Sequence, residues 1–364
     1  MKVLFISRAT LYKVTGGDTI QVIKTAEELR KLGVTVDIVL SDQKNIDYAQ
    51  YDLLHFFNII RPSDMLYHIQ QSKKPFVVSS IYLLYEDFEK NAQIKSPKDV
   101  VMRLLNASQK EYLKVIARRI INRETIVSPR YLVWGHKKSI RYILKHTALL
   151  LPNSENEYRR LKKDFPEAGG YAVIPNAADP GFFNCTQEDI DRKDPKMVMC
   201  VARIEGRKNQ LNVIRALKDT DFQLYIVGKA APNHQKYLEQ CRQEAGPNVH
   251  FMDFVDKTTL RDLFRKAKVH ILPSWFETTG LSTLEAMFCG CNVVITKYGD
   301  TLDYFKSRNT FVCEPDDARS IKDSITQAAA FPNKMEYFEQ EIKDYCWMNT
   351  GIQTLNAYKK TLGI

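Results

Sequence analysis

The feature that most constrains the fold of this chain is the alternation of short, continuous apolar runs with amphipathic helical patterns. In the first half, strands are predicted at Lys2–Ile6, Val34–Leu40, Asp52–Phe57, Phe76–Ser79 and Ala148–Leu151. A helix is predicted over Thr19–Leu32 and ends at Gly33. Another begins at Ser154, which has capping-box spacing to Glu157. Runs that are apolar on both faces are typical of parallel strands covered by helices.

The alternation stops after residue 174, passes through an acidic, irregular stretch, and then starts again. Further strands are predicted at Met197–Ala202, Phe222–Val227, Val249–Phe254, Val269–Leu272, Asn292–Thr296 and Thr310–Cys313. The helices between them are predicted at Gln210–Leu217, His234–Glu244, Thr258–Ala267, Gly280–Phe288 and Ala318–Ala330. The 364 residues therefore predict two doubly wound, Rossmann-like α/β domains, roughly 1–174 and 175–345. A final helical segment, 346–364, can pack on either domain.

Two loops that follow predicted strands contain groups that suit a phosphate. Gly16 and Gly17 precede the first helix, where backbone amides can approach an anion, although a plain turn has the same composition. Arg203 and Lys208 follow the first strand of the second domain. A guanidinium binds phosphate bidentately and an ammonium binds it as a point charge, whereas a solvated basic turn is the alternative. Ligands bind at such strand ends, so two facing domains predict a deep cleft.

A third constellation has two glutamates, Glu277 and Glu285, on either side of a predicted helix start. Glu277 stands at the loop edge, where its carboxylate can meet sugar hydroxyls or simply complement the helix dipole. Glu285 lies two turns into the helix among apolar residues, where a carboxylate needs a partner such as ribose hydroxyls. The amides of Thr279, Gly280 and Leu281 at the helix start are suited to an anion or to hydroxyls.

These motifs together resemble family 4 retaining glycosyltransferases with the GT-B fold, the glycosyl transferases group 1, over almost the whole chain. The segments that carry the resemblance are Gly16-Gly17, Ile174–Asp179, Val201–Arg203 with Lys208-Asn209, Glu277–Met287 with Gly290–Val294, and the helix Trp347–Tyr358. The resemblance implies an acceptor-side domain over 1–174, a donor domain over 175–345, and a terminal helix, 346–364, that crosses back to the first domain.

The resemblance also implies roles for the charged residues. Arg203 and Lys208 would neutralise the diphosphate of a nucleotide-sugar donor, Glu277 would contact the donor sugar near the reacting centre, and Glu285 would bind the ribose. Preorganised cations and helix-start amides can stabilise a departing diphosphate without a metal, so no metal or other cofactor is expected. The run Asp189-Ile190-Asp191 lies in the acidic linker, far in sequence from these cations.

Further donor contacts are implied for residues at neighbouring strand ends. Gly16 and Gly17 would pack against the diphosphate, Phe254 and Val255 would flank the base, and Gly228 would leave space at a strand end.

The chain departs from the family pattern in the first domain. Many members have a histidine after the strand predicted at Phe76–Ser79, but here Ser80 and Tyr82 follow it and are candidates by position only. His55 ends another strand near the expected cleft, and either a cleft role or an ordinary structural role fits it.

The formal charge of +10 is concentrated in one segment. Residues 101–150 contain 11 basic and 2 acidic side chains, whereas 151–364 contain 29 of each, which disfavours a general nucleic-acid coat. An amphipathic helix is predicted over 101–123. The cations considered as a membrane or acceptor patch are Arg103, Lys110, Lys114, Arg118, Arg119 and Arg123. An ordinary surface helix and adsorption to an anionic membrane both fit this pattern.

The sequence therefore predicts transfer of a sugar to a glycan or lipid-linked acceptor in surface-polysaccharide or lipopolysaccharide biosynthesis, in the cytoplasm or at the inner face of the cytoplasmic membrane. Its seven cysteines fit reduced thiols, and its longest apolar runs are too short for a leader or a span. The alternatives are a soluble acceptor, a non-catalytic nucleotide- or glycan-binding relative, and a GT-B epimerase.

Overall fold

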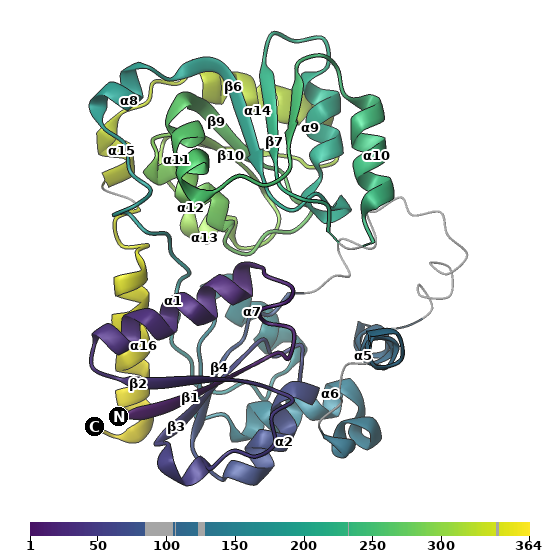
Figure 1. Cartoon of the computed structure of the whole chain (residues 1–364), viewed down its shortest axis with the longest axis vertical. Helices are drawn as coiled ribbons and strands as arrows, with labels where there is room; N and C mark the ends of the chain where they lie inside the picture. Colours follow the sequence, from purple (N-terminus) through teal and green to yellow (C-terminus); the bar gives the residue numbers. More distant parts are fainter. Residues whose placement is uncertain (84–104, 106, 123–127, 232, 340–341) are drawn as a thin grey trace. The chain divides into compact units, whose positions relative to one another are not determined.

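The computed structural model describes residues 1–83, 105, 107–122, 128–231, 233–339 and 342–364 (Figure 1). The chain divides into two units. Among the described residues, the first unit contains those up to Asn176 together with Trp347–Ile364, and the second contains Ala177–Cys346. Each unit has one wholly parallel sheet with helices, so the predicted α/β fold class is confirmed. No helix in the described part of the chain is both long and apolar enough to cross a bilayer.

The first unit has a five-stranded sheet with the order β2-β1-β3-β4-β5. Its strands are β1 (Lys2–Ser7), β2 (Thr35–Leu40), β3 (Leu53–Phe57), β4 (Phe76–Ser79) and β5 (Leu149–Leu150). Its helices are α1 (Gly17–Lys31), α2 (Ser63–Ser72), α5 (Ala107–Asn122), α6 (Pro129–His146), α7 (Glu155–Asp164) and α16 (Trp347–Leu362), with a 3-10 turn at Tyr48–Gln50. The sequence patterns did not predict α2 or α6.

Both faces of this sheet are buried, which explains why its strands are continuous apolar runs. On β1, Val3 and Phe5 pack in the core under α1 and α16, whereas Leu4 and Ile6 pack in the core under α2, α6 and α7. Full burial of each such side chain contributes about 1.5–3 kcal/mol, so two covered faces stabilise the strand strongly.

The second unit has a six-stranded sheet with the order β11-β10-β9-β6-β7-β8. Its strands are β6 (Asp194–Val201), β7 (Gln223–Val227), β8 (Val249–Met252), β9 (Ala267–Leu272), β10 (Asn292–Thr296) and β11 (Thr310–Cys313). Its helices are α8 (Gln187–Asp191), α9 (Gln210–Leu217), α10 (Gln235–Glu244), α11 (Lys257–Lys266), α12 (Leu281–Phe288), α13 (Thr301–Tyr304), α14 (Ala318–Ala330) and α15 (Met335–Glu339), with a 3-10 turn at Gly206–Lys208.

The stretch expected to be irregular contains a short helix, α8. Asp189 Oδ2 accepts hydrogen bonds from the backbone N–H of Thr186 at 2.9 Å and from its hydroxyl at 3.1 Å, so this carboxylate caps the helix. A reciprocal capping box overrides the weak apolar pattern, which is why the composition alone suggested a linker.

The terminal helix α16 packs on α1 in the first unit. Its Tyr358 hydroxyl lies 2.6 Å from Nδ1 of His55, and the other ring nitrogen of His55 lies 2.8 Å from the hydroxyl of Ser79. Burial lowers the pKa of His55 to about 3, so the ring is neutral. His55 therefore ties β3 to β4 and to α16, and this geometry gives no support to the cleft role considered for it.

We expect Tyr358→Phe to destabilise the first unit by about 1–3 kcal/mol, because it leaves a buried imidazole nitrogen without its partner. Thermal and urea unfolding measure this change. Tyr12→Phe, at a side chain that is 57% exposed, is the matched control and should leave stability unchanged. Equal stability of the two variants would contradict the anchoring role of this bond.

Candidate functional site

The site lies where the strand order of the second unit reverses. From β6 the chain proceeds outward through β7 and β8, and then returns to place β9 on the other side of β6. Loops that leave the carboxyl ends of β6 and β9 therefore diverge, and ligands of doubly wound sheets bind at such a point. The loop after β6 carries Arg203, Arg207 and Lys208, and the loop after β9 carries Ser274 and Glu277.

A buried ion pair joins these two loops. The Lys208 ammonium donates a short hydrogen bond to Glu277 Oε2, and the hydroxyl of Ser274 donates to the same oxygen at 2.9 Å. The side chains of Lys208 and Glu277 are 13% and 6% exposed. Glu277 accepts only one of the three hydrogens that the ammonium can donate, so Lys208 keeps donors for a ligand.

The charges around Glu277 keep it ionised. Burial by itself raises its pKa, but Lys208 and Arg207 outweigh burial, and together with the hydrogen bonds from Lys208 and Ser274 they lower the pKa of Glu277 to about 2. The loop therefore presents a permanent carboxylate beside an ammonium.

The other two cations, Arg207 and Arg203, differ in how closely they are bonded to neighbouring groups. Arg207 donates to the carbonyl of Phe276 at 3.0 Å and to Glu205 at 3.1 Å, so it braces the two loops. The side chain of Arg203 is 46% exposed, and its nearest acid, Glu205, lies 3.8 Å away. Arg203 is therefore the guanidinium that remains open to an anion.

The start of α12 adds backbone donors to the site. Gly280 precedes the helix in the left-handed region, with φ of 71°, and turns the chain from the Glu277 loop into α12. In the described part of the chain, the backbone N–H groups of Gly280, Leu281 and Ser282 donate to no acceptor. Free amides at a helix N-terminus are suited to an anion or a hydroxyl. The side chain of Thr279 is buried beside them.

Glu285 differs from Glu277 in having no cation at hydrogen-bond distance. It lies partly buried on α12, and its carboxylate has no hydrogen-bond partner among the described residues. Burial raises its pKa to about 7, and the charge of Lys257 reduces the shift only in part. A carboxyl group that is desolvated without a partner is a candidate for ligand hydroxyls.

Two glycines allow backbones to approach closely at the site. A Cβ on Gly299, whose φ is +104°, would lie 1.9 Å from the carbonyl oxygen of Glu277. A Cβ on Gly228 would lie 2.0 Å from the carbonyl oxygen of Ala202. Gly228 therefore lets the backbone of Ala202 approach closely at this strand end, and the donor contact implied for Gly228 stays a prediction. Sequence reasoning missed Gly299, although its position just after β10 is a signal of a strand-end turn.

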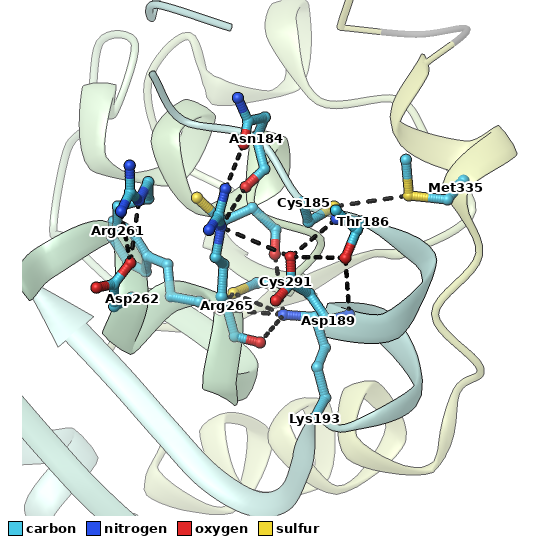
Figure 2. A network of polar contacts seen from close by, with 12 residues as sticks. Asn184, Cys185, Thr186, Asp189, Lys193, Arg261, Asp262, Arg265, Cys291 and Met335 are labelled. Atoms are coloured by element: carbon cyan, nitrogen blue, oxygen red, sulfur yellow. Dashed lines mark hydrogen bonds and ion pairs between the residues drawn. The ribbon is translucent and has the colours of Figure 1, made fainter. Parts of the chain in front are cut away.

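Lys193 supports α12 from its far end, and no sequence pattern predicted this (Figure 2). Its buried ammonium donates to four backbone carbonyls at 2.9–3.1 Å, three at the end of α11 and one, that of Cys289, at the end of α12. A cation at helix C-termini complements their partial negative charge. The run Cys289-Gly290-Cys291 packs around it, and Cys291 Sγ lies 3.1 Å from the carbonyl of Phe264.

The residues expected to flank a base lie beyond β8, two strands from β6. Phe254 is 75% exposed, and the ammonium of Lys229 lies 5.4 Å from the centre of its ring. Val255 instead packs partly buried against the core below α11 and α12. Phe254 therefore has the open ring face that stacking requires, and Val255 does not.

In the first unit, the glycine loop is shaped by Arg8, which sequence reasoning missed. Arg8 forks onto the carboxylate of Asp18 at 2.6 and 3.1 Å and also donates to the carbonyl of Val14 at 2.6 Å. Gly16 precedes α1 and Gly17 is its exposed first residue. The hydrogen bonds of Arg8 therefore hold this loop in place at the start of α1.

Ser80 and Tyr82 are buried and form hydrogen bonds with carboxylates on α7. The hydroxyl of Ser80 donates a short hydrogen bond to Glu157 Oε1, and the backbone N–H of Tyr82 donates to the same atom at 3.2 Å. The Tyr82 hydroxyl donates to Asp164 at 2.8 Å. Glu157 has the capping position predicted for it, because its N–H donates to Ser154 at 3.0 Å. These hydrogen bonds join Ser80 and Tyr82, which follow β4, to the helix α7.

The predicted basic helix is α5, but most of its candidate patch is not described. Arg103 and Arg123, and the side chains of Arg118 and Arg119, lie outside the described residues. Lys110 is partly buried, and Lys114 pairs with Glu111 at 2.8 Å. The described part of α5 therefore presents less free charge than the sequence pattern suggested.

We expect Glu285→Gln to raise stability at pH 8. The pKa of this carboxyl is about 7 in the folded protein and 4.5 in the unfolded chain. Between these pH values the folded state binds more protons, so the free energy of unfolding decreases as pH rises. The amide does not ionise, so the variant avoids this decrease, which is on the order of 1–3 kcal/mol. Thermal unfolding of both proteins at pH 4 and pH 8 is the measurement. The variants should coincide at pH 4, and an equal difference at both pH values would contradict the assignment.

We expect Gly299→Ala to destabilise the second unit by about 2–4 kcal/mol, since the methyl group collides with the Glu277 carbonyl in a strained conformation. Gly169→Ala, which meets no atom within 4 Å, is the control. Unfolding monitored by calorimetry compares the two. Wild-type stability of the Gly299 variant would show that this close approach does not hold the loop.

Known proteins match parts of this chain. Residues 186–345 match the family model of glycosyl transferases group 1. An uncharacterized glycosyltransferase of Methanocaldococcus jannaschii is 30% identical over 209 residues, which are 51% of this chain and 53% of that protein. O-antigen chain mannosyltransferase B of Escherichia coli is 30% identical over 115 residues, 30% of each protein. The chain thus spans about half the length, or less, of the curated relatives it matches.

Solved structures match over the full length. Sucrose-phosphate synthase of Thermosynechococcus elongatus has a TM-score of 0.75 at 18% identity, covering 100% of this chain and 99% of that one. Anabaena HepE in complex with UDP-glucose has a TM-score of 0.67 at 18% identity, covering 99% and 100%. At such identities the likeness establishes the fold. The chain therefore has the GT-B fold, and its residues 186–345 match the model of the glycosyl transferases group 1 family.

Proposed function

We propose that this protein is a retaining, metal-independent glycosyltransferase that moves a sugar from a nucleotide-diphosphate sugar to an acceptor. The observation that carries the proposal is the buried Lys208–Glu277 pair, which stands beside the open Arg203 and the free amides of α12 within the group 1 domain. The similarity to Anabaena HepE, solved in complex with UDP-glucose, supports a nucleotide-sugar donor.

The chemistry needs positive charge where the nucleoside diphosphate departs. In the proposed complex, Arg203 binds the diphosphate with its guanidinium fork, and the remaining donors of Lys208 bind it as a point charge. The amides of Gly280 and Leu281 add fixed partial charge at the helix start. Because the ion pair with Glu277 holds the Lys208 ammonium in place, this charge needs little reorganisation during bond cleavage.

The two glutamates then have different tasks. Glu277 stays ionised and stands where sugar hydroxyls reach the loop, so it positions the donor sugar beside its own ammonium partner. Glu285 accepts hydrogen bonds from ribose hydroxyls or donates to them, and these bonds supply the partners that its partly buried carboxyl lacks within the described residues. Phe254 presents its exposed ring to the base. In retention, the departing diphosphate itself takes the acceptor proton on the face from which it leaves.

The acceptor is proposed to be a glycan or a lipid-linked glycan in cell-surface polysaccharide or lipopolysaccharide assembly, on the cytoplasmic side of the membrane. The 30% identity to an O-antigen chain mannosyltransferase over part of the chain supports this class of acceptor.

We expect Lys208→Met and Glu277→Gln each to lower the transfer rate by about 100-fold or more, the effect of removing one preorganised charged group at a departing oxyanion. Transfer from radiolabelled nucleotide sugars to membrane extracts is the assay, and circular dichroism confirms folding. Lys334→Met and Glu336→Gln, at an exposed pair 3.6 Å apart, are the matched controls and should keep full activity. Full activity of both site variants would overturn the proposal.

The donor can be identified by thermal stabilisation. A nucleotide diphosphate present at 100 times its Kd stabilises the protein by about 2.7 kcal/mol. Among uridine, guanosine, adenosine and thymidine diphosphates, one should raise the melting temperature, and Arg203→Gln should weaken that shift. Stabilisation by none of them would count against a nucleotide-sugar donor.

A further inference from the structure

The helix α6 has an unusual combination of exposed apolar residues and unpaired charge. It is interrupted at Gly135, whose φ of 70° and ψ of −177° are not helical. Just before this break, Val133 is 84% exposed and Leu132 is 45% exposed. Val133 is thus among the most exposed large apolar side chains in the described part of the chain, and it stands at the bend of a helix rather than at a chain end.

The same helix also carries several cations. The helix contains no acidic residue, and its exposed cations are Arg130, Lys137, Lys138, Arg141 and Lys145. Arg141 pairs with Glu167 at 3.1 Å, and no ion pair is formed by the other four within the described residues. The basic excess that the sequence concentrates in 101–150 therefore reaches the surface on α6 more than on the described part of α5.

Trp134 lies between the apolar and the basic residues. The ammonium of Lys138 is 5.6 Å from its ring centre, and the guanidinium of Arg130 is 5.9 Å away. Its ring also packs at 5.1 Å against Tyr142. Tryptophan and tyrosine beside lysine and arginine are typical of side chains that sit at the level of lipid headgroups.

The helices α5 and α6 pack together in the first unit (Figure 1). Residues of both helices line a groove that adjoins the exposed surface of α6. It has a volume of about 830 Å³, and its lining includes Tyr112, Leu113, Trp134, Lys137, Lys138 and Arg141. The groove therefore combines apolar side chains with the cations of the exposed surface, which suits a ligand that joins an anionic group to an apolar chain.

We propose that α6 docks on an anionic phospholipid bilayer, with Leu132 and Val133 inserted among the headgroups and the exposed cations of the same helix on lipid phosphates. Each cation near such a surface contributes to binding, and the short apolar insertion orients the helix. The inference deepens the proposed function and rests on it in one respect: the adjoining groove would receive the anionic end of a lipid-linked acceptor from the membrane.

The test is co-sedimentation of the full chain with vesicles, without donor or acceptor. Vesicles of phosphatidylcholine mixed with phosphatidylglycerol should bind the protein at low salt at least ~10-fold more strongly than phosphatidylcholine alone, and high salt should weaken the binding. Equal binding to both vesicles would overturn the proposal. Equally tight binding to dextran sulfate would also overturn it, since it would indicate a soluble acidic partner.

Matched variants separate the apolar and the charged contributions. Leu132→Ser with Val133→Ser keeps the charge and should weaken vesicle binding about 10-fold, whereas Met348→Ser with Ile352→Ser, two exposed apolar residues on α16, should not. Lys137→Gln with Lys138→Gln should weaken binding and its salt dependence, whereas Lys359→Gln with Lys360→Gln should not. Equal losses in test and control pairs would contradict a specific surface.

Lipid-side quenching locates the contact. Phospholipids brominated near the headgroup should quench part of the tryptophan fluorescence of the wild type, and Trp134→Phe should abolish that quenching while binding persists. Unchanged quenching in this variant would place the contact elsewhere. Vesicle binding is measured without turnover, so the two proposals can fail separately. If the wild type does not bind vesicles but the Lys208 and Glu277 variants lose transfer, only the docking surface is rejected. If the wild type binds vesicles but these variants keep full transfer, only the transferase proposal is rejected.

Discussion

The buried ion pair of Lys208 and Glu277 is the interaction on which the site depends. It joins the loops after β6 and β9 at the point where the strand order reverses, so the two loops cannot move apart without exposing unpaired buried charge. Removing one partner of such a pair typically costs about 3–5 kcal/mol. The pair therefore fixes an ammonium and a carboxylate at the strand ends.

The surroundings of the pair explain how two glutamates in one motif acquire different chemistry. Glu277 lies against Lys208 and Arg207 and has a pKa of about 2, whereas Glu285 lies in a desolvated position on α12 and has a pKa of about 7. Environments that push the pKa values of two carboxyls apart assign them different roles. Lys193, at the far end of α12, and Gly299, against Glu277, hold the elements that create these environments.

Much of the architecture was predictable from local pattern. The strands were found because both faces of each sheet are covered, which makes the runs continuous and short. The helix α12, with Glu285 on it and Glu277 in the loop before it, was found because a turn with glycine precedes a strong apolar pattern. The helix α6 was not predicted, since a break at Gly135 interrupts its periodicity. The chemistry of His55 was not predicted either, because it depends on Tyr358, 303 residues away.

The sequence by itself determined the α/β class, the order of the strands along the chain, and the residue types available at the strand ends. Only the tertiary structure decided which of those residues meet. It bonded Ser80 and the backbone of Tyr82 to Glu157, brought the carbonyl of Ala202 close to Gly228, and left Arg203 partly exposed. The physical reason is that periodicity reports which face of an element is buried, whereas hydrogen bonds and charges depend on pairings between distant segments that no local pattern encodes.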